Sequence, residues 1–254
     1  MLVLTYNVNG LRSAISKGFL TWLQATNADV VCLQEIKSHP DDYDLSVFHL
    51  LGYKVYWHPA VKKGYSGTAL LCKQEPLNVE IGCGMNHYDM EGRIIRADFE
   101  NVSVASLYLP SGSSGEERQA FKFQCMDEMF PYFQELKAKI PNIIIGGDYN
   151  ICHRPIDIHN PKSNANSSGF LPAEREWMEK LLSSGFTDTF RHFNPEPHNY
   201  TWWSFRANSR AKNLGWRIDY LLAGEALNDR LVRAAILPEA KHSDHCPSLV
   251  EIRD

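Results

Sequence analysis

The sequence predicts an α/β protein in which two mixed β-sheets pack face to face and helices cover their outer faces. Three observations lead to this prediction. Short apolar segments bounded by turn residues recur along the whole chain. Helical patterns are fewer, and they do not alternate with the strands as βαβ units would. Between residues 53 and 109, short turns join neighbouring strands as in hairpins. No linker rich in Pro, Gly or Ser divides the chain, so we expect one domain over 1–254.

The expected strands are short and rich in β-branched or aromatic residues. They cover residues 2–6, 30–33, 54–58, 68–72, 79–81, 94–99, 102–109, 143–145, 218–222, 232–237 and 248–252. A first helix is indicated by the helical spacing of Ile15, Phe19, Trp22 and Leu23. A second begins near residue 115 and ends near Ile140, and Pro131 inside it predicts a kink or a break. A third begins at Pro172 and ends near Gly185.

Composition excludes several classes of protein. The chain has 254 residues, 44% of them hydrophobic, which is enough for a sizeable core. No apolar run approaches the roughly 18 residues of a membrane span. The N-terminus has no basic region before its apolar residues and is typical of a strand, not of a signal peptide. The six cysteines form no C-x-x-C pair, so we expect no zinc site and a reduced, cytoplasmic setting.

One segment has the composition of a nucleic-acid surface, although the net charge of the chain is −4. Residues 197–218 contain no acid, and cations alternate there with aromatic residues. Cations bind phosphates and rings stack on bases or sugars. A packed aromatic loop with solvated cations would have the same composition, so both interpretations stay open here. The polar segment 153–168 is long for a loop and is typical of a functional one.

The stretch 142–150, with the sequence NIIIGGDYN, is the most informative strand end. Three isoleucines predict a buried strand, and an acid and an amide follow at i and i+2. If the extended backbone continues, Asp148 and Asn150 point to the same face and can orient a water molecule. An Asx turn after the strand is equally compatible with these residues.

Other strand ends carry polar residues of the same kind. They are Asn7, Asn9, Glu35, Tyr108, Asp219, Asp244 and His245. Each has an ordinary explanation as well, such as turn residues, a Glu35–Lys37 pair or a buried partner for Arg217. Because ligands bind where strand ends meet, one shared site would explain all of them. The set supplies oxygen ligands for Mg²⁺ or Mn²⁺, a carboxylate to activate water and an imidazole for a phosphate oxygen. It therefore favours metal-assisted phosphodiester hydrolysis.

Five blocks carry a resemblance to a known family. They are LTYNVNGLR at 4–12, QEIK at 34–37, GDYN at 147–150, GWRIDY at 215–220 and SDHCP at 243–247. Together, in this order and over essentially the whole chain, they resemble the exonuclease III family of apurinic/apyrimidinic (AP) endonucleases. The resemblance implies a four-layered α/β sandwich and Mg²⁺ dependence, with Mn²⁺ as a substitute. It also implies incision 5′ to abasic sites in duplex DNA, 3′–5′ exonuclease activity and cleaning of blocked 3′ ends. We expect a monomer without an obligate protein partner, in the cytoplasm.

The resemblance also implies roles for individual residues. Glu35 is the expected main metal ligand, and the full expected set is Glu35, Asn7, Asp244, Asn9, Asp148 and Asn150. Asp148 activates or orients water, with Asn150 beside it. His245 polarises the phosphate and Asp244 orients it. Tyr108 contacts the phosphate or leaving group, and Asp219 is a site-orienting acid.

The substrate contacts follow from the same resemblance. Trp202, Trp216 and Ile218 form the expected pocket for a flipped-out abasic sugar, and Asn164 is expected to contact substrate. The residues expected on the DNA are Lys63, Tyr65, Arg93, Lys122, Arg206, Arg210 and Lys212. Asn9 stands where some members have Asp, and Ser111 where others have Asn.

Two other functions remain as alternatives. One is a phosphatase or phosphodiesterase of the same superfamily that acts on lipids, inositol phosphates or mRNA tails. The basic, tryptophan-rich segment argues against it. The other is a DNA-binding domain without catalytic activity, and the complete polar set argues against that.

Overall fold

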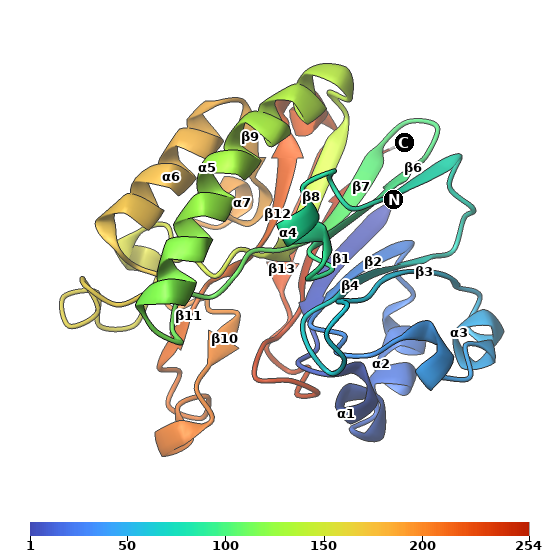
Figure 1. Cartoon of the computed structure of the whole chain (residues 1–254), viewed down its shortest axis with the longest axis horizontal. Helices are drawn as coiled ribbons and strands as arrows, with labels where there is room; N and C mark the ends of the chain where they lie inside the picture. Colours follow the sequence, from blue (N-terminus) through green and yellow to red (C-terminus); the bar gives the residue numbers. More distant parts are fainter. Residues whose placement is uncertain (254) are drawn as a thin grey trace.

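The computed structural model describes residues 1–253, which contain two six-stranded mixed sheets (Figure 1). The strands of the first sheet are β1 (Leu2–Asn7), β2 (Val30–Gln34), β3 (Lys54–His58), β4 (Thr68–Cys72), β13 (Leu231–Ile236) and β14 (Ser248–Ile252). Their order is β13-β14-β1-β2-β4-β3. The strands of the second sheet are β5 (Asn78–Ile81), β6 (Ile94–Asp98), β7 (Ser103–Tyr108), β8 (Ile143–Asp148), β9 (Phe186–Asp188) and β12 (Asp219–Gly224). Their order is β5-β6-β7-β8-β12-β9.

Helices cover the two outer faces. They are α1 (Leu11–Ser16), α2 (Phe19–Thr26), α3 (Ser46–Leu50), α4 (Asn86–Asp89), α5 (Glu116–Lys139), α6 (Pro172–Ser183) and α7 (Thr189–Phe193). Short 3₁₀ helices span Pro40–Asp42, Pro155–Asp157, Arg206–Asn208 and Glu225–Arg230. Figure 1 shows α5 and α6 on one side of the sandwich and α1 to α3 on the other. None of the helices within residues 1–253 combines the length and apolarity that a transmembrane helix needs.

Successive side chains of a strand point to opposite faces of its sheet, and this explains the four layers. In β1, Val3 points into the core between the sheets, whereas Leu4 points to the core under α1 and α2. Phe133 and Met178 of α5 and α6 pack on the outer face of the second sheet. Each sheet is therefore buried on both faces, which is why its strands are almost continuously apolar. The predicted four-layered α/β sandwich is confirmed.

Two predicted helices differ from the structure. The first is two helices, because Gly18, with φ of 93°, separates α1 from α2. The predicted break at Pro131 is wrong, because α5 runs through it without interruption for 24 residues. Pro131 lacks an N–H, so the carbonyl of Asp127 loses its helical partner. Both residues lie on the exposed face of α5, so the loss of this bond leaves no polar group in the core.

Close packing of backbones extends β8 beyond its isoleucines. A Cβ atom at Gly147 would lie 1.9 Å from the carbonyl oxygen of Leu107 on β7. At Gly146 it would lie 2.7 Å from Leu221 on β12. At Gly147 the neighbouring atom belongs to the backbone, so only glycine fits there, and β8 stays paired with both neighbours as far as Asp148. The strand thereby carries its carboxylate to the end of the sandwich. Two further short strands, β10 (Trp202–Trp203) and β11 (Gly215–Trp216), form a separate hairpin at this end.

Candidate active site

Polar residues from both sheets meet at one end of the sandwich. Asn7, the last residue of β1, pairs with Gln34, the last residue of β2. In the second sheet Tyr108 pairs with Asp148, and Asp148 pairs with Asp219. Strand pairing alone therefore brings together residues that lie far apart in the sequence. The convergence of strand ends expected from the sequence is observed.

A cleft of about 320 Å³ opens at this end. It is lined by Glu35, Tyr108, Ser111, Ser113, Asp148, Asn150, Ser168, Gly169, Trp202, Trp216, Ile218, Asp244 and His245. Asn7, Asn9 and Asp219 lie behind it and hydrogen-bond to lining residues. Acids and an imidazole thus face the cleft together with two tryptophans. Such a cleft can hold an anionic group beside an apolar one.

Asn7 joins the carboxylates of Glu35 and Asp148. Its amide nitrogen donates to Glu35 Oε1 at 2.9 Å and to Asp148 Oδ2 at 2.8 Å. Lys37 pairs with the other oxygen of Glu35 at 2.7 Å. Burial alone would raise the pKa of Glu35, but Lys37 and Asn7 hold it below the usual range. Glu35 is therefore ionised, and the pairing with Lys37 considered from the sequence also occurs.

His245 has a different acidic partner from the one expected. Its Nδ1 lies 2.9 Å from Asp219 Oδ2, and both side chains are buried. Burial lowers the pKa of His245, but the attraction and hydrogen bond of Asp219, aided by Asp148 and Asp244, raise it to about 10. The imidazole is therefore protonated at neutral pH. Asp219, not Asp244, orients the ring, because the carboxylate of Asp244 is directed elsewhere.

The carboxylate of Asp244 belongs to a separate chain of contacts. It accepts from the amide nitrogen of Asn9 at 2.9 Å and from Trp202 Nε1 at 3.0 Å. The amide oxygen of Asn9 in turn accepts from Lys37. Both polar atoms of Asn9 are thus used within the protein. Asp244 remains at the edge of the cleft and holds the Trp202 ring in place.

Asp148 is the acid with the most unusual electrostatics. Burial, followed by repulsion from Asp219 and Glu35, raises its pKa to about 7 although His245 opposes the shift. His245 Nε2 lies 3.9 Å from Asp148 Oδ2. A carboxylate with a pKa near neutrality can accept a proton from water. Its position among other acids also marks a place where positive charge is favourable.

The residues present fit a divalent cation. Glu35, Asp148 and His245 offer ligand atoms that all lie within 4.8 Å of one another. Because the protonated imidazole has no free lone pair, the two carboxylates are the candidate ligands among these three. Carboxylate oxygens suit Mg²⁺ and Mn²⁺.

Asn150 lies in a turn and not in an extension of β8. Its backbone has φ of 52°, and its N–H donates to Asp148 Oδ1 at 2.8 Å. This is the Asx turn considered from the sequence. The expectation that an extended backbone carries both side chains to one face is wrong. The side chain of Asn150 nevertheless lines the cleft, where its nitrogen donates to the carbonyl of Leu109 at 2.9 Å.

Arg93 does not reach the surface, so its expected contact with DNA is corrected. The residue is 1% exposed, and its guanidinium pairs with Glu91 at 2.6 Å. It also lies over the ring of Tyr108, 4.3 Å from the ring centroid, and donates to the Tyr108 carbonyl. Arg93 therefore fixes Tyr108. The pKa of Tyr108 is well above its usual range because of burial and the nearby Glu35 and Asp148.

Lys122 requires the same correction. Its side chain is fully buried and pairs with Glu174 of α6 at 2.5 Å. The same ammonium donates to the carbonyl of Asn150 at 2.8 Å. Burial lowers the pKa of Lys122. A cation enclosed in this way braces the turn after β8 and is not available to DNA.

The other residues expected on DNA lie outside the cleft. Lys63, Arg206 and Lys212 are exposed, and Tyr65 is half-buried with its hydroxyl between Arg93 and Arg118. Asn164 donates to the carbonyls of His159 and Asn160 within its own turn. Arg210 is occupied by carbonyl oxygens of 238–245, so its expected phosphate contact is corrected.

The apolar wall of the cleft rests on its own small core. Cys152, Ile158, Phe170 and Ile218 are buried, and Trp202 and Trp216 pack against them. The two tryptophan rings lie 6.0 Å apart at an angle of 89°. A Cβ atom at Gly169, which has φ of 90°, would lie 3.1 Å from the Trp216 ring. Glycine therefore allows the end of loop 153–168 to touch the ring.

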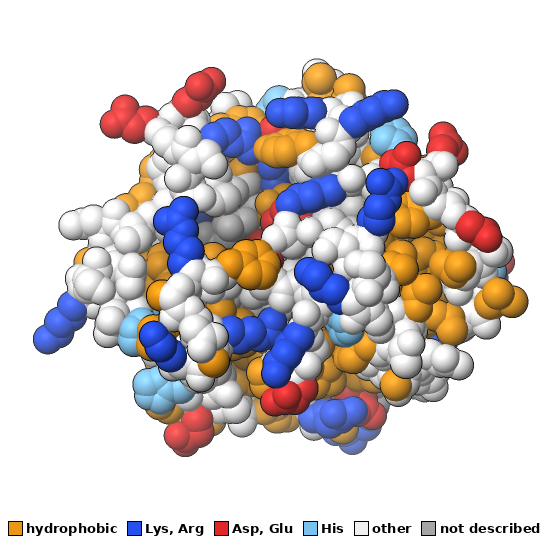
Figure 2. All heavy atoms as spheres, turned by 90° about the horizontal axis from the view of Figure 1, so that it is seen from below, with side chains coloured by type: hydrophobic (Ala, Val, Ile, Leu, Met, Phe, Trp, Pro, Cys, Tyr) orange, Lys and Arg blue, Asp and Glu red, His pale blue; other side chains and the backbone are white. Residues whose placement is uncertain are grey.

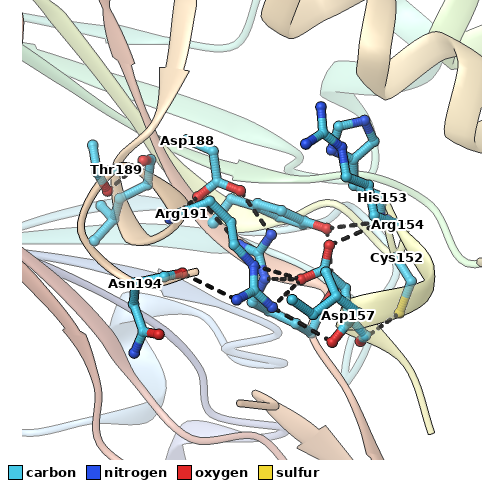
Figure 3. A network of polar contacts seen from close by, with 12 residues as sticks. Cys152, His153, Arg154, Asp157, Asp188, Thr189, Arg191 and Asn194 are labelled. Atoms are coloured by element: carbon cyan, nitrogen blue, oxygen red, sulfur yellow. Dashed lines mark hydrogen bonds and ion pairs between the residues drawn. The ribbon is translucent and has the colours of Figure 1, made fainter. Parts of the chain in front are cut away.

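A buried ionic network of Asp157, Asp188, Arg191 and Arg217 lies next to this apolar wall (Figure 3). Asp157 pairs with Arg191 at 2.6 Å and with Arg217 at 2.7 Å. Arg217 also pairs with Asp188 at 2.7 Å. Its backbone N–H donates to the carbonyl of Asp157 at 2.8 Å, beside Trp216. The suggestion that Arg217 is the partner of Asp219 is wrong, because its acids are Asp157 and Asp188.

Three residues that line the cleft were not predicted from the sequence. Ser113, Ser168 and Gly169 lie in irregular loops and share no motif with the strand ends. Only Gly169 leaves a trace in the sequence, since glycine marks positions with positive φ. Their place at the cleft follows from loop packing in three dimensions.

Comparison with known proteins gives consistent results. Residues 4–245 match the model of the endonuclease/exonuclease/phosphatase family. An exodeoxyribonuclease of Bacillus subtilis is 45% identical over 249 residues, which is 97% of each chain. The DNA repair nuclease APEX1 of Danio rerio is 39% identical over 97% of this chain and 80% of its own.

Solved structures show the same likeness. A Neisseria 3′ phosphatase, NExo, bound to a product DNA hairpin, superposes with a TM-score of 0.92 at 26% identity over both complete chains. An AP endonuclease of Archaeoglobus fulgidus gives a TM-score of 0.91 at 29% identity, also over both complete chains.

Proposed function

The chain belongs to the endonuclease/exonuclease/phosphatase family, and we propose that it is a DNA repair nuclease that cuts duplex DNA on the 5′ side of abasic sites. The proposal includes removal of nucleotides and of blocking groups from 3′ ends. One observation carries it: a protonated His245 held by Asp219 faces, across one cleft, the carboxylates of Glu35 and Asp148. This arrangement suits a phosphodiester and a water molecule at the same time.

The residues of the cleft have separate proposed roles in hydrolysis. Asp148, with its pKa raised to about 7, accepts the proton of the attacking water, and the turn to Asn150 fixes its carboxylate. His245 donates a hydrogen bond to a phosphate oxygen, and Asp219 keeps the ring protonated and oriented. The phenol of Tyr108 stays protonated and can donate to negative charge that develops on phosphate or leaving group.

We propose that Glu35 and Asp148 hold the divalent cation, with Mg²⁺ as the natural ion and Mn²⁺ as a substitute. Asn7 keeps their carboxylates in place, and the remaining coordination is left to water and substrate. The cation supplies positive charge next to the phosphate when it is bound.

Trp202, Trp216 and Ile218 are proposed to enclose the abasic sugar. Their wall is apolar and lies next to the acids. A site without a base has no pair to break, so it leaves the helix at low cost. The likeness to a 3′ phosphatase bound to DNA supports the proposal that 3′ ends enter the same cleft.

The surface around the cleft supports duplex DNA as the substrate. Figure 2 shows the lower end of the molecule, where Lys and Arg side chains are spread over the face and acidic ones lie mainly at its margin. Exposed Lys63, Arg206 and Lys212 are proposed to contact the DNA backbone, with Tyr65 and Asn164 as further contacts. We also propose that the protein acts as a monomer and as one catalytic domain, in the cytoplasm.

A cleavage assay tests the function. A labelled duplex with one abasic analogue is incubated with Mg²⁺ and, in parallel, with EDTA. We expect one cut on the 5′ side of the analogue with Mg²⁺ and none with EDTA. The same duplex without the analogue is the control for general nuclease activity. Intact duplex under both conditions would exclude the proposed function, whereas hydrolysis of inositol phosphates or sphingomyelin would favour the other branch of the family.

A further inference from the structure

A projecting arm connects β10 to β11 next to the cleft. The arm comprises residues 204–214, and Figure 1 shows it hanging from these two strands at the lower end of the molecule. Most of its side chains are exposed, and Phe205 is 73% exposed. Ala207, Asn208 and Asn213 have positive φ although they are not glycine. The arm is therefore a strained, exposed loop that requires an anchor to keep its shape.

Arg210 provides that anchor and reaches into the segment that carries His245. Residues 238–245 are called the catalytic turn below. Nη1 of Arg210 donates to the carbonyl of Ser243 at 2.9 Å and approaches that of His245 at 3.5 Å. Nη2 donates to the carbonyls of Pro238 at 2.9 Å and Ala240 at 2.6 Å. Within residues 1–253 these carbonyls have no other hydrogen bond, so the guanidinium joins Pro238, Ala240 and Ser243 to one another. In the same turn the carbonyl of His242 accepts from Lys17.

The position of the guanidinium is fixed from the other side as well. It lies over the ring of Trp203, 4.6 Å from the ring centroid. The backbone N–H of Trp203 donates to the carbonyl of Asp244 at 3.1 Å, and that of Cys246 donates to Thr201 at 2.7 Å. The end of the catalytic turn thus forms an antiparallel β-bridge with β10, between His245 and Trp202. A guanidinium has five N–H donors in one plane, so it can stack on a ring and serve several carbonyls at once, whereas a lysine has three donors and no plane to stack.

We propose that Arg210 is a positioning residue that ties the DNA-facing arm to the catalytic turn and thereby keeps His245 aligned with the phosphate. The proposal rests on the function proposed above, because it takes the arm as a DNA contact and His245 as the phosphate donor. Contact of the arm with DNA and alignment of the imidazole then depend on the same side chain. Loss of the guanidinium releases the carbonyls of the turn while the exposed arm cations stay in place.

The experiment compares three arginines that differ in their partners. Arg210→Met removes the fork. Arg206→Met changes a cation of the same arm whose side chain has no partner among the described residues. Arg233→Met changes an exposed arginine on β13 that pairs only with Glu251. Cleavage is measured in single turnover at saturating enzyme with Mg²⁺, and affinity for the abasic duplex is measured separately in EDTA.

Opposite effects are expected from the two arm variants. Arg210→Met lowers the single-turnover rate by ~10²-fold, as a small displacement of a catalytic group does, and leaves affinity in EDTA close to the wild type. Arg206→Met weakens binding and lowers the slope of log affinity against log salt by ~1, with little change in the rate at saturation. Arg233→Met changes neither. A wild-type rate in Arg210→Met overturns the proposal.

Chemical rescue separates positioning from general destabilisation. Arg210→Gly leaves a space over Trp203, and methylguanidinium at millimolar concentration can occupy it. We expect the added compound to restore part of the cleavage rate of Arg210→Gly and to have no effect on Arg206→Met. Absence of rescue, with Arg210→Gly folded by circular dichroism, counts against the proposal.

A further measurement does not depend on activity. Hydrogen exchange of the Trp203 and Cys246 amides in EDTA should be faster in Arg210→Met than in Arg233→Met. Unchanged exchange at both amides overturns the tie between arm and turn, even if the rate is lower. If the wild type cuts no DNA at all, the proposed function fails, and hydrogen exchange still decides the role of Arg210.

Discussion

The imidazole of His245 and the carboxylate of Asp219 form one buried unit, with Nδ1 2.9 Å from Oδ2. Asp219 raises the pKa of His245 and, by repulsion, also that of Asp148. Asp219 therefore affects the protonation of both His245, the proposed donor to the phosphate, and Asp148, the proposed acceptor of a proton from water.

Replacement of Asp219 tests this unit. In Asp219→Asn the pKa of His245 falls because its counter-charge is lost, and we expect kcat at pH 7.5 to fall by roughly 10²–10⁴-fold. The imidazole pKa is followed by NMR titration in the metal-free protein. Asp244→Asn is the matched control, since Asp244 does not hydrogen-bond the ring, and its effect on the imidazole should be smaller. A smaller loss in Asp219→Asn than in Asp244→Asn would contradict the assignment.

The pH dependence of cleavage follows from the same pair. Asp148 acts when ionised, and its pKa of about 7 applies without a cation. A bound divalent cation lowers that value, so activity should decline as the pH falls through a midpoint at or below about 7. At high pH, activity should decline as His245 loses its proton near its pKa of about 10. The measurement is kcat/KM against pH at constant ionic strength. Because Asp219 raises the pKa of Asp148, Asp219→Asn should move the acid midpoint to lower pH, and a move to higher pH would be inconsistent.

Asp148→Asn separates binding from chemistry. The carboxylate is assigned to water and the cation, not to DNA, so affinity for an abasic duplex in EDTA should be retained or increased. Cleavage with Mg²⁺ should fall by at least the ~10²–10⁴-fold that a general base contributes. The hydrogen bond from Asn150 can persist because the amide keeps an oxygen. Unchanged turnover would show that the role of Asp148 is misassigned.

The sequence predicted the layers and the convergence of strand ends because both depend on local patterns. Short apolar runs place β1 and β8 in the core, and an acid or amide just after a buried strand has to lie at the end of the sheet. Partnerships between side chains were less predictable. Asp244 is adjacent to His245 in the chain, yet its carboxylate contacts Asn9 and Trp202, and the ring contacts Asp219 of another strand.

Cations that are already paired inside the protein were the other reason why predicted DNA contacts were wrong. Arg93 and Lys122 are cations of the kind that contact DNA. Only the folded structure reveals that both are buried, Arg93 against Glu91 and Lys122 against Glu174. Similarly, Arg210 lies within a basic, exposed segment, but its carbonyl partners come from 238–245. A sequence pattern indicates which residues are cationic and not which of them already have partners.

Asp157 gives the last prediction, which concerns stability. Burial raises the pKa of Asp157, but Arg217 and Arg191 outweigh burial and lower it to about 2. A carboxyl with a depressed pKa stabilises the fold above its unfolded pKa of about 3.9, and this stabilisation is lost as the pH falls toward the folded value. The shift corresponds to roughly 2–3 kcal/mol. Asp157→Asn also leaves Arg217 buried with one acid fewer, so we expect a total loss of about 3–5 kcal/mol at neutral pH.

Urea unfolding at several pH values measures this contribution. The difference in unfolding free energy between wild type and Asp157→Asn should be largest near pH 6 and should shrink by about 1 kcal/mol by pH 3. Glu239→Gln, at an exposed position with only a distant lysine, should differ from wild type by no more than about 0.5 kcal/mol. Because the network lies under Trp216 and Ile218, the Asp157 variant should also lose affinity for the abasic duplex. A difference that stays constant with pH would mean that the pKa of Asp157 is the same in the folded and the unfolded protein.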